Sequence, residues 1–306
     1  MLDRRFEEAV SGFAEAIRQN IDELVLNEFE EEQPATQDNR FAEPVKDELG
    51  LDKMFEDVLS DMDNNVIKPM LIERPINRGH FSQIDRLFNM FRGAYRSPVD
   101  AFICGGYVRW ACSPLGDPVP PQDLDIYCST EDVFNKLRGF FTRIGLRAKL
   151  VNEVSVTYHR GNNDIWATLP PIQLIKPLQE GRMMTTGSMT DILANFDFSI
   201  IRCGFDAELF SRRVAMCDVD FEKDETAKRL VLKNIHCPVS SMFRCIKYCN
   251  RGYKLATHEM LKLFVDWETR PPEYRETIKK FFARMSLGVK ISATEFNTMY
   301  RSMRVD

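Results

Sequence analysis

One stretch, residues 102–128, constrains the fold more than any other part of the chain. It reads FICGGYVRWACSPLGDPVPPQDLDIYC. The apolar run 101–104 is stopped by Gly105 and Gly106, which predicts a short buried strand followed by a turn. Residues 107–113 then predict a short helix that ends at a proline-rich loop. The stretch therefore predicts a strand, a glycine turn and a helix in close succession.

Asp123 and Asp125 close this stretch, in residues 123–127, where polar and apolar side chains alternate. In a strand, side chains two apart point the same way, so both carboxylates face one side. Adjacent carboxylates repel unless a cation neutralises them, and Mg²⁺ commonly binds one or two carboxylates plus substrate phosphates. Glycines before a helix let backbone N–H groups approach a phosphate. Each feature alone is typical of a plain turn or strand end, but together they outline a phosphoryl- or nucleotidyl-transfer site.

The same residues resemble the GG-x-V-R-D … D-x-D signature of poly(A) polymerases and CCA-adding enzymes, within the DNA polymerase beta-like nucleotidyltransferase superfamily. The matching residues are Gly105, Gly106, Val108, Arg109, Asp123 and Asp125. One departure is Trp110, which stands where those enzymes carry an acid. The resemblance covers roughly residues 83–255. It implies an α+β fold, a mixed β-sheet flanked by helices, with Mg²⁺ or Mn²⁺ as the metal and an NTP substrate, ATP being favoured.

The resemblance also implies roles for individual residues. Asp123 and Asp125 would bind metal, and Gly105 and Gly106 would cradle the triphosphate. Arg109 and Lys247 are the candidate phosphate contacts. Nucleotidyl transfer by two metals also needs a third acid.

Two positions compete for the third acid. Gln173, in IQLI, stands where many relatives carry an acid, and Asp197, in NFDFSI, is an acid at the start of the next strand. We favour Asp197 as a catalytic metal ligand, because IQLI followed by a capped helix and F-D-F-[ST]-I resembles a divergent branch from viruses, phages and mobile elements. If Asp197 only caps or turns the chain, the third acid is missing and the protein is catalytically inactive.

Residues 241–255 predict a helix with a cationic face. Its Arg and Lys residues are spaced by three and four, so they share one face if the helix runs that far, although Gly252 makes its end uncertain. Tyr248 lies next to this face and is a candidate to clamp or stack a base. The candidate nucleotide contacts are Lys247 and Tyr248, and the candidate nucleic-acid contacts are Arg244, Arg251 and Lys254. A solvated basic face is the plain alternative.

Local signals predict the remaining elements. Caps and turns give helix starts at Ser82, at Ser129 or Thr130, and at Ser188 with Asp191. The expected elements are a helix over 83–95, a helix over 131–144, one or two strands over 147–159, a strand over 172–175, a helix over 189–195, a strand over 196–205 and its hairpin partner over 211–218.

The chain divides into three expected segments. Residues 1–50 combine an amphipathic helix with an acidic linker, which is a candidate site for a protein partner. Residues 51–218 form the nucleotidyltransferase-like catalytic domain, and residues 219–306 form a helical, locally basic C-terminal region.

Composition narrows the class of protein. The net charge of −5 excludes a global basic footprint, so any RNA must be held by a local patch. The eight cysteines are scattered, which is typical of reduced thiols, and no apolar run is long enough for a membrane span, so we expect a cytoplasmic protein (the host cytoplasm if it is viral). Two functions stay open: a Mg²⁺-dependent nucleotidyltransferase that acts on an RNA 3′ end, a protein hydroxyl or a small molecule, with RNA slightly favoured, and an inactive relative that serves as a binding or assembly module.

Overall fold

The computed structural model describes residues 68–95, 100–152, 154–159, 168–180, 183–236, 238–276, 278 and 280. The expected N-terminal helix and acidic linker lie outside these residues, as does the basic sequence that follows residue 280. Within the described part of the chain, no helix has both the length and the apolar character needed to cross a membrane.

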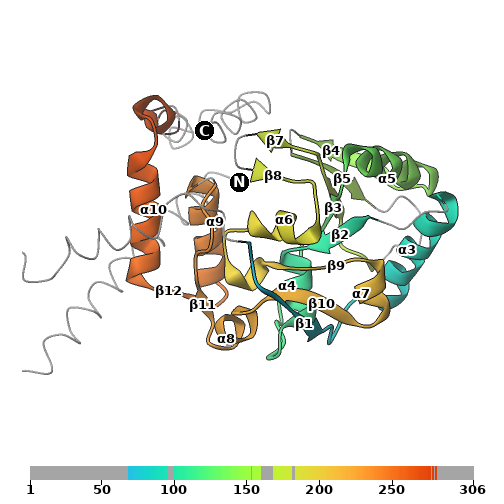
Figure 1. Cartoon of the computed structure of the whole chain (residues 1–306), viewed down its shortest axis with the longest axis horizontal. Coiled ribbons are helices and arrows are strands. Elements are labelled where there is room, and N and C mark those ends of the chain that lie inside the picture. Colours follow the sequence, from blue (N-terminus) through green and yellow to red (C-terminus); the bar gives the residue numbers. More distant parts are fainter. Residues whose placement is uncertain are drawn as a thin grey trace, which may run out of the picture.

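An eight-stranded mixed sheet forms the centre of the molecule, with the strand order β1-β10-β9-β2-β3-β6-β5-β4 (Figure 1). Only the pairing of β3 with β6 is parallel among these neighbours, and the others are antiparallel. In sheet order the strands are β1 Leu71–Pro75, β10 Val214–Asp218, β9 Cys203–Phe205, β2 Ala101–Cys104, β3 Leu124–Cys128, β6 Ile172–Ile175, β5 Ser155–His159 and β4 Arg147–Val151. The expected α+β fold, with a mixed sheet flanked by helices, is confirmed.

Alternation along β3 gives the sheet two chemically different faces. Leu124, Ile126 and Cys128 are buried, whereas Asp125 and Tyr127 between them are only partly buried and point to the other face. The sequence pattern of this strand therefore fixes which face carries the carboxylates.

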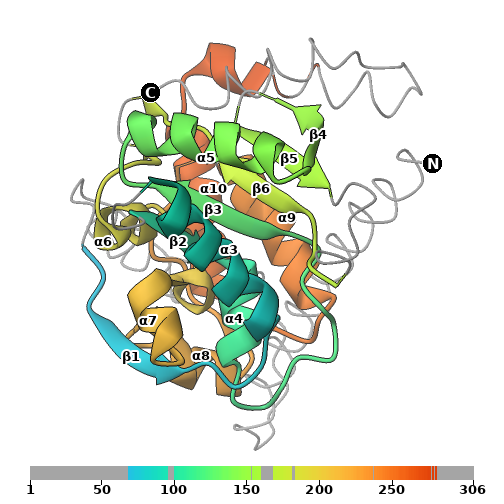
Figure 2. The ribbon, with the colours of Figure 1, turned by 90° about the vertical axis from the view of Figure 1, so that its right-hand side faces the viewer.

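The apolar face of the sheet is covered by α3 (Phe81–Tyr95) and α5 (Glu131–Arg143), which lie side by side over it (Figure 2). Each helix buries a stripe of large side chains at helical spacing, and a fully buried Phe such as Phe141 stabilises the fold by about 1.5–3 kcal/mol. Thr130 caps α5 by accepting a hydrogen bond from the Val133 amide, as expected. The expected cap at Ser82 is wrong, because α3 already begins at Phe81.

Shorter elements flank the site. Helix α4 (Gly106–Cys112) contacts β2, β3 and β9, and α7 (Ala207–Ser211) packs on β9 and β10. Helix α6 (Met189–Ala194) covers the carboxylate-bearing face, where its buried Ile192 and Leu193 pack against Cys104. The predicted capping box of Ser188 and Asp191 starts this helix.

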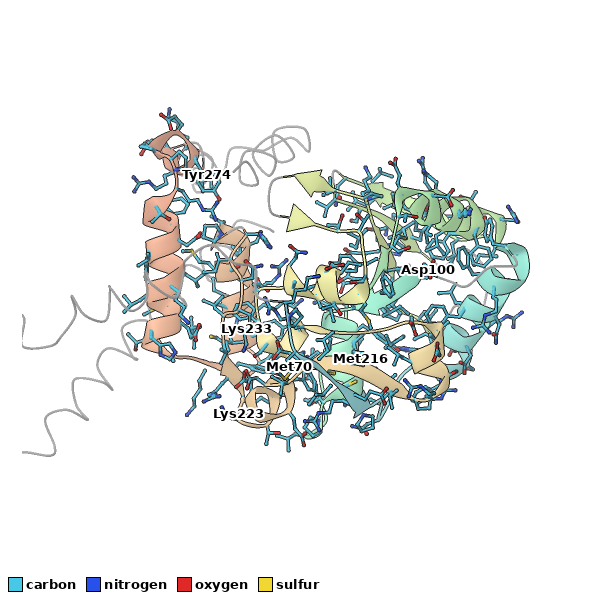
Figure 3. The ribbon with its side chains drawn as sticks, in the orientation of Figure 1. Met70, Asp100, Met216, Lys223, Lys233 and Tyr274 are labelled. Carbon is cyan, nitrogen blue, oxygen red and sulfur yellow. The ribbon has the colours of Figure 1, made fainter. Side chains whose placement is uncertain are left out.

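The C-terminal part packs through a second apolar cluster, which includes Phe198, Ile200, Tyr248, Tyr253 and Leu263. Members of this cluster come from both sides of the boundary expected after residue 218. The elements around this cluster are η2 Ser199–Ile201, α8 Phe221–Thr226, α9 Pro238–Cys249 and α10 Thr257–Thr269, with a small sheet made of β11 Arg229–Leu230 and β12 Lys254–Leu255. Another small sheet, made of β7 Gln179–Glu180 and β8 Met183–Met184, precedes α6 in the chain. Tyr274 lies beyond the end of α10 (Figure 3). Its ring packs against Trp267 of that helix.

The segment 196–205 differs from the expected continuous strand. Phe198, Ile200 and Ile201 are all buried in the second cluster, which requires the 3₁₀ turn η2 there rather than an alternating strand. Only Cys203–Phe205 enters the sheet, as β9, and α7 replaces the expected hairpin turn before β10. An apolar run alone does not distinguish these arrangements.

Candidate functional site

The two aspartates of the glycine–aspartate motif lie at the start of β3, in the middle of the sheet. Asp125 is paired with Cys104 of β2 and with Gln173 of β6 in the strand register. Asp123 directly precedes the strand rather than lying within it as expected. Asp125 points to the face of the sheet that α6 covers, as the alternation of β3 requires.

The carboxylate pair carries an electrostatic penalty. The pKa of Asp125 is raised to about 7, chiefly by loss of hydration and then by the charge of Asp123, while Arg244 and Lys247 oppose the rise. A hard divalent cation bound by oxygen atoms of both carboxylates would remove this penalty. The donor set therefore fits Mg²⁺ or Mn²⁺ held by Asp123 and Asp125, with water and substrate phosphates as the other ligands.

Gln173 occupies the position beside the pair. Its side-chain amide donates a hydrogen bond to Oδ2 of Asp123 at 3.0 Å. In the strand register it also lies next to Asp125. An uncharged side chain thus lies next to both carboxylates of the pair.

The glycine turn approaches the pair from β2. Gly105 has a φ of 79°, and a Cβ atom at this position would lie 3.0 Å from the Phe196 ring and 3.8 Å from Oδ2 of Asp125. Its N–H donates to the carbonyl of Cys203, so this amide is committed to β9 rather than to a phosphate. A Cβ at Gly106 would meet no atom within 4 Å outside its own helix backbone and chain neighbours, so there is open space over Gly106.

Helix α9 brings two cations to the carboxylates. Partial desolvation lowers the pKa of Lys247, whereas the charges of Asp123 and Asp125 act in the opposite direction. Arg244 lies one helical turn earlier and also lowers the pKa of Asp125. Arg244 and Lys247 are thus close enough for their charges to act on the carboxylate pair.

Asp197 is not part of the carboxylate pair. It is 3% exposed, and its Oδ2 accepts hydrogen bonds from Arg244 Nη1 at 2.6 Å and from Ser241 Oγ at 3.0 Å. Among the described residues, which include all three aspartates, no group of three or more acidic, His or Cys side chains is arranged to hold a metal ion. The side chain of Asp197 thus binds α9, and the expectation that it completes a three-carboxylate site stays a prediction.

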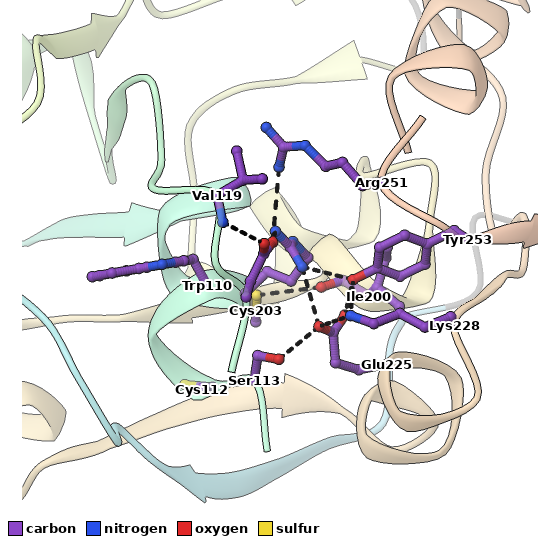
Figure 4. Close-up of polar contacts among 12 residues, drawn as sticks. Trp110, Cys112, Ser113, Val119, Ile200, Cys203, Glu225, Lys228, Arg251 and Tyr253 are labelled. Carbon is purple, nitrogen blue, oxygen red and sulfur yellow. Dashed lines mark hydrogen bonds and ion pairs between the residues drawn. The ribbon is translucent and has the colours of Figure 1, made fainter. Parts of the chain in front are cut away.

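Arg109 is not a phosphate contact. Only 1% of it is exposed, and its guanidinium is held by Asp117, by Glu225 Oε1 at 3.1 Å and by Tyr253 Oη at 2.6 Å. Figure 4 shows Glu225 and Tyr253 converging in this cluster with Ser113 and Lys228. Arg109 thus ties α4 to the C-terminal part.

Tyr248, Arg251 and Lys254 were also expected to contact the nucleotide or nucleic acid, but in the structure each contacts other residues of the protein or lies outside α9. Tyr248 is buried in the second apolar cluster, with the Arg109 guanidinium 5.4 Å from its ring centroid, so it does not stack a base. Arg251 follows the end of α9 and lies 4.0 Å from Asp117. Lys254 is in β12, because the chain turns at Gly252 with a φ of 84°. The expected four-residue helical face is therefore reduced to Arg244 and Lys247.

Sequence reasoning missed the acidic partners of these cations. Asp117 lies in the proline-rich loop and Glu225 in α8, and neither has a local signal of its role. Ser241, which binds Asp197, appears in the sequence only as the start of an expected helix. The resemblance, rather than a local signal, identifies Gln173 as a competing position, and the structure places it between two buried residues of β6.

Comparisons with known proteins find similarity in structure alone. No protein-family model matches the chain, and no curated protein matches it. Solved structures that are similar include a CCA-adding enzyme in an apo form, at 16% identity and a TM-score of 0.44, covering 63% of this chain and 45% of that one.

Two further structures that are similar to this chain are bacterial CCA-adding enzymes, each solved with a bound molecule. A Thermotoga maritima CCA-adding enzyme complexed with tRNA has 14% identity and a TM-score of 0.45, with 76% of this chain and 55% of that one covered. A Bacillus stearothermophilus CCA-adding enzyme in complex with CTP has 13% identity and a TM-score of 0.43, with coverages of 69% and 49%. The chain thus spans about half the length of these enzymes. Likeness at this level does not assign an activity to the chain.

Proposed function

We propose that the protein binds a nucleoside triphosphate with Mg²⁺ or Mn²⁺ and transfers its nucleoside monophosphate to a hydroxyl group, releasing pyrophosphate. The observation that carries this proposal is the carboxylate pair, Asp123 and Asp125, with a raised pKa at Asp125 and the cations Arg244 and Lys247 acting on it. Two adjacent carboxylates suit a divalent cation, and the cationic side chains beside them suit a polyanion. A metal–triphosphate complex supplies both charges.

Each group has a defined part in this reaction. Asp123 and Asp125 would hold the metal ion, which supplies charge neutralisation at the phosphates. Lys247 would neutralise the triphosphate, and Gly106 lets a phosphate approach the backbone without a side chain between them. The acceptor oxygen forms a bond to the α-phosphorus, the bond to pyrophosphate breaks, and the hydroxyl proton is released. Positioning and charge neutralisation supply most of the rate in such displacements.

The acceptor class is a further part of the proposal. We favour an RNA 3′ end as the acceptor, because the basic residues Arg244 and Lys247 of α9 act on the carboxylate pair. We favour ATP as the donor, which is the nucleotide that the sequence resemblance favours. A protein hydroxyl or a small molecule is the alternative acceptor.

A second function is favoured by Gln173. Because an uncharged amide lies beside the pair and Asp197 binds Arg244, the described residues offer two carboxylates for metal rather than three. A protein with this site would bind nucleotide and metal without transferring, and would act as a binding or assembly module.

One experiment separates the two functions. The protein is incubated with each α-labelled NTP in Mg²⁺ or Mn²⁺, with total RNA and the protein itself as acceptors. Asp125→Asn, which keeps the shape and removes the charge, is compared with Asp132→Asn, an exposed aspartate on α5. Label transferred by the wild type and by Asp132→Asn but not by Asp125→Asn supports the transferase. Metal-dependent NTP binding without transfer to any acceptor supports the binding module. Absence of both contradicts both functions.

A further inference from the structure

Asp197 is fixed from several directions. Its backbone carbonyl accepts a hydrogen bond from the Lys233 amide at 2.7 Å. Its side-chain Oδ2 accepts from Ser241 Oγ and Arg244 Nη1, both on α9. Its Oδ1 is buried and accepts no hydrogen bond from the described residues. Such a buried charge is costly unless its ionic partner stays in place, so the pair with Arg244 sets the geometry of both residues.

The Arg244 side chain forms an ion pair with buried Asp197 and is also partly exposed to solvent. One Nη atom is 2.6 Å from buried Asp197, yet 49% of the side chain is exposed. Its charge also acts on Asp125 and on Lys247. Arg244 therefore lies between a buried acid that fixes it and the carboxylate pair that would hold a metal–triphosphate.

We infer that Asp197 is a positioning residue: it holds the Arg244 guanidinium so that its exposed edge contacts the triphosphate of an NTP bound at Asp123 and Asp125. This inference rests on the proposed nucleotide site. It assigns Asp197 to substrate binding through Arg244 and to no direct contact with the metal. A planar guanidinium offers several N–H donors in a fixed fork, so one edge binds a carboxylate while another binds phosphate oxygens.

The chain contains a matched control for this arrangement. Asp224 is also buried, and it accepts hydrogen bonds from Ser199 Oγ at 2.6 Å and from Arg229 Nη2 at 2.6 Å. Arg229 is half exposed, at 45%. The largest charges that act on Arg229 are those of Asp224, Asp220 and Glu259. The two clusters thus share their chemistry and differ in their position relative to the site.

The experiment compares Asp197→Asn with Asp224→Asn. Each substitution keeps a hydrogen-bonding side chain and removes one buried negative charge. Binding of ATP is measured in the presence of saturating Mn²⁺, and Mn²⁺ binding without nucleotide is measured by paramagnetic resonance. We expect Asp197→Asn to weaken ATP binding by about tenfold, the scale of one charge-assisted hydrogen bond, while Mn²⁺ affinity stays unchanged. Asp224→Asn should leave both affinities at the wild-type value.

A double-substitution cycle tests whether Asp197 acts through Arg244. Arg244→Gln should weaken ATP binding at least as much as Asp197→Asn, and the pair of substitutions should cost no more than Arg244→Gln alone. Because the Gln amide can still donate a hydrogen bond to Asp197 and Ser241 still donates to it, Arg244→Gln gives a measurement even if Asp197→Asn fails to fold. The inference is overturned if Arg244→Gln binds ATP like the wild type, or if the two effects are additive.

Two other outcomes would show whether the inference about Asp197 or the proposed function is wrong. A loss of Mn²⁺ affinity in Asp197→Asn would make Asp197 a metal ligand and overturn the inference while leaving the proposed function in place. A wild-type protein that binds neither Mn²⁺ nor ATP would overturn the proposed function, and the inference with it.

Discussion

Gln173 donates a hydrogen bond from its amide to Asp123 at 3.0 Å, and the parallel pairing of β6 with β3 sets the same residue beside Asp125. The amide satisfies one carboxylate oxygen without adding charge to the pair. Its replacement by a carboxylate of the same shape would add a negative charge and would exchange the amide group that donates to Asp123 for an oxygen that only accepts. The number of acids at the site is therefore testable by a single substitution.

The substitution Gln173→Glu should strengthen Mn²⁺ binding by about tenfold or more, because a third carboxylate adds an oxygen ligand and a negative charge. Without metal, the same variant should be less stable by about 1 kcal/mol or more, since three acids then repel one another. Calorimetric titration with Mn²⁺ and denaturant unfolding in chelator measure the two effects. If the protein is a binding module only for lack of this acid, the variant should also gain transfer activity.

The matched control is Gln83→Glu, since Gln83 also donates its amide to a neighbour, Thr168, but on the surface of α3. It should change neither metal affinity nor stability. An unchanged Mn²⁺ affinity in Gln173→Glu would show that β6 does not reach the metal.

The pH dependence of stability follows from the raised pKa of Asp125. In the folded state this pKa is about 7, above the ordinary value of 3.8. Between these values the folded protein binds more protons than the unfolded chain, so stability should fall as pH rises from about 4 to about 7 and then level off. The neighbouring charges are those of Asp123, which strengthens this effect, and of Arg244 and Lys247, which weaken it. Denaturant unfolding of the metal-free protein across this range measures it.

Asp125→Asn is uncharged at every pH and should remove the contribution of Asp125 to this fall. At about pH 8 the variant should therefore be more stable than the wild type in chelator. Equal slopes for the two proteins would mean that Asp125 is ionised throughout.

Local signals in the sequence correctly predict the strand that carries Asp125 and the starts of the helices α5 and α6. The alternation of residues 123–127 places Asp125 on the correct face of β3, and the caps at Thr130 and Ser188 are those observed. These signals depend on neighbours within one turn or one strand. For that reason they can be read without knowledge of the fold.

The partners of the charged residues depend on contacts that no local signal carries. Arg109 meets Glu225 and Tyr253, which lie 116 and 144 residues away in the chain. Arg244 meets Asp197 across 47 residues. A residue type at a motif position predicts which chemistry is present, but only the packing of α4 and α9 shows whether a side chain faces the ligand or the interior.

Arg109 gives a stability prediction of its own. Arg109→Met should destabilise the fold by about 3–5 kcal/mol, because it leaves Asp117 and Glu225 buried without their main ionic partner. Denaturant unfolding measures this loss. As a control, Lys136→Gln breaks an exposed pair with Asp132 on α5 and should change stability by less than about 0.5 kcal/mol.

A small loss in Arg109→Met would contradict this assignment. Stability within about 1 kcal/mol of the wild type would mean that water compensates both acids and that the cluster does not hold α4. Nucleotide binding should then be examined in the variant, because an intact fold with lost binding would return Arg109 to the ligand site.

The two glycines of the turn should respond differently to alanine. Gly105→Ala places a Cβ 3.0 Å from the Phe196 ring at a φ of 79°, so it should destabilise the protein by about 1–3 kcal/mol. Gly106→Ala meets no atom within 4 Å at the start of α4 and should leave stability equal or slightly higher. If a phosphate lies over Gly106, the added methyl group should weaken ATP binding by about tenfold or more. Thermal unfolding and ATP titration of both variants separate the effects, and wild-type ATP binding by a stable Gly106→Ala variant would place the triphosphate elsewhere.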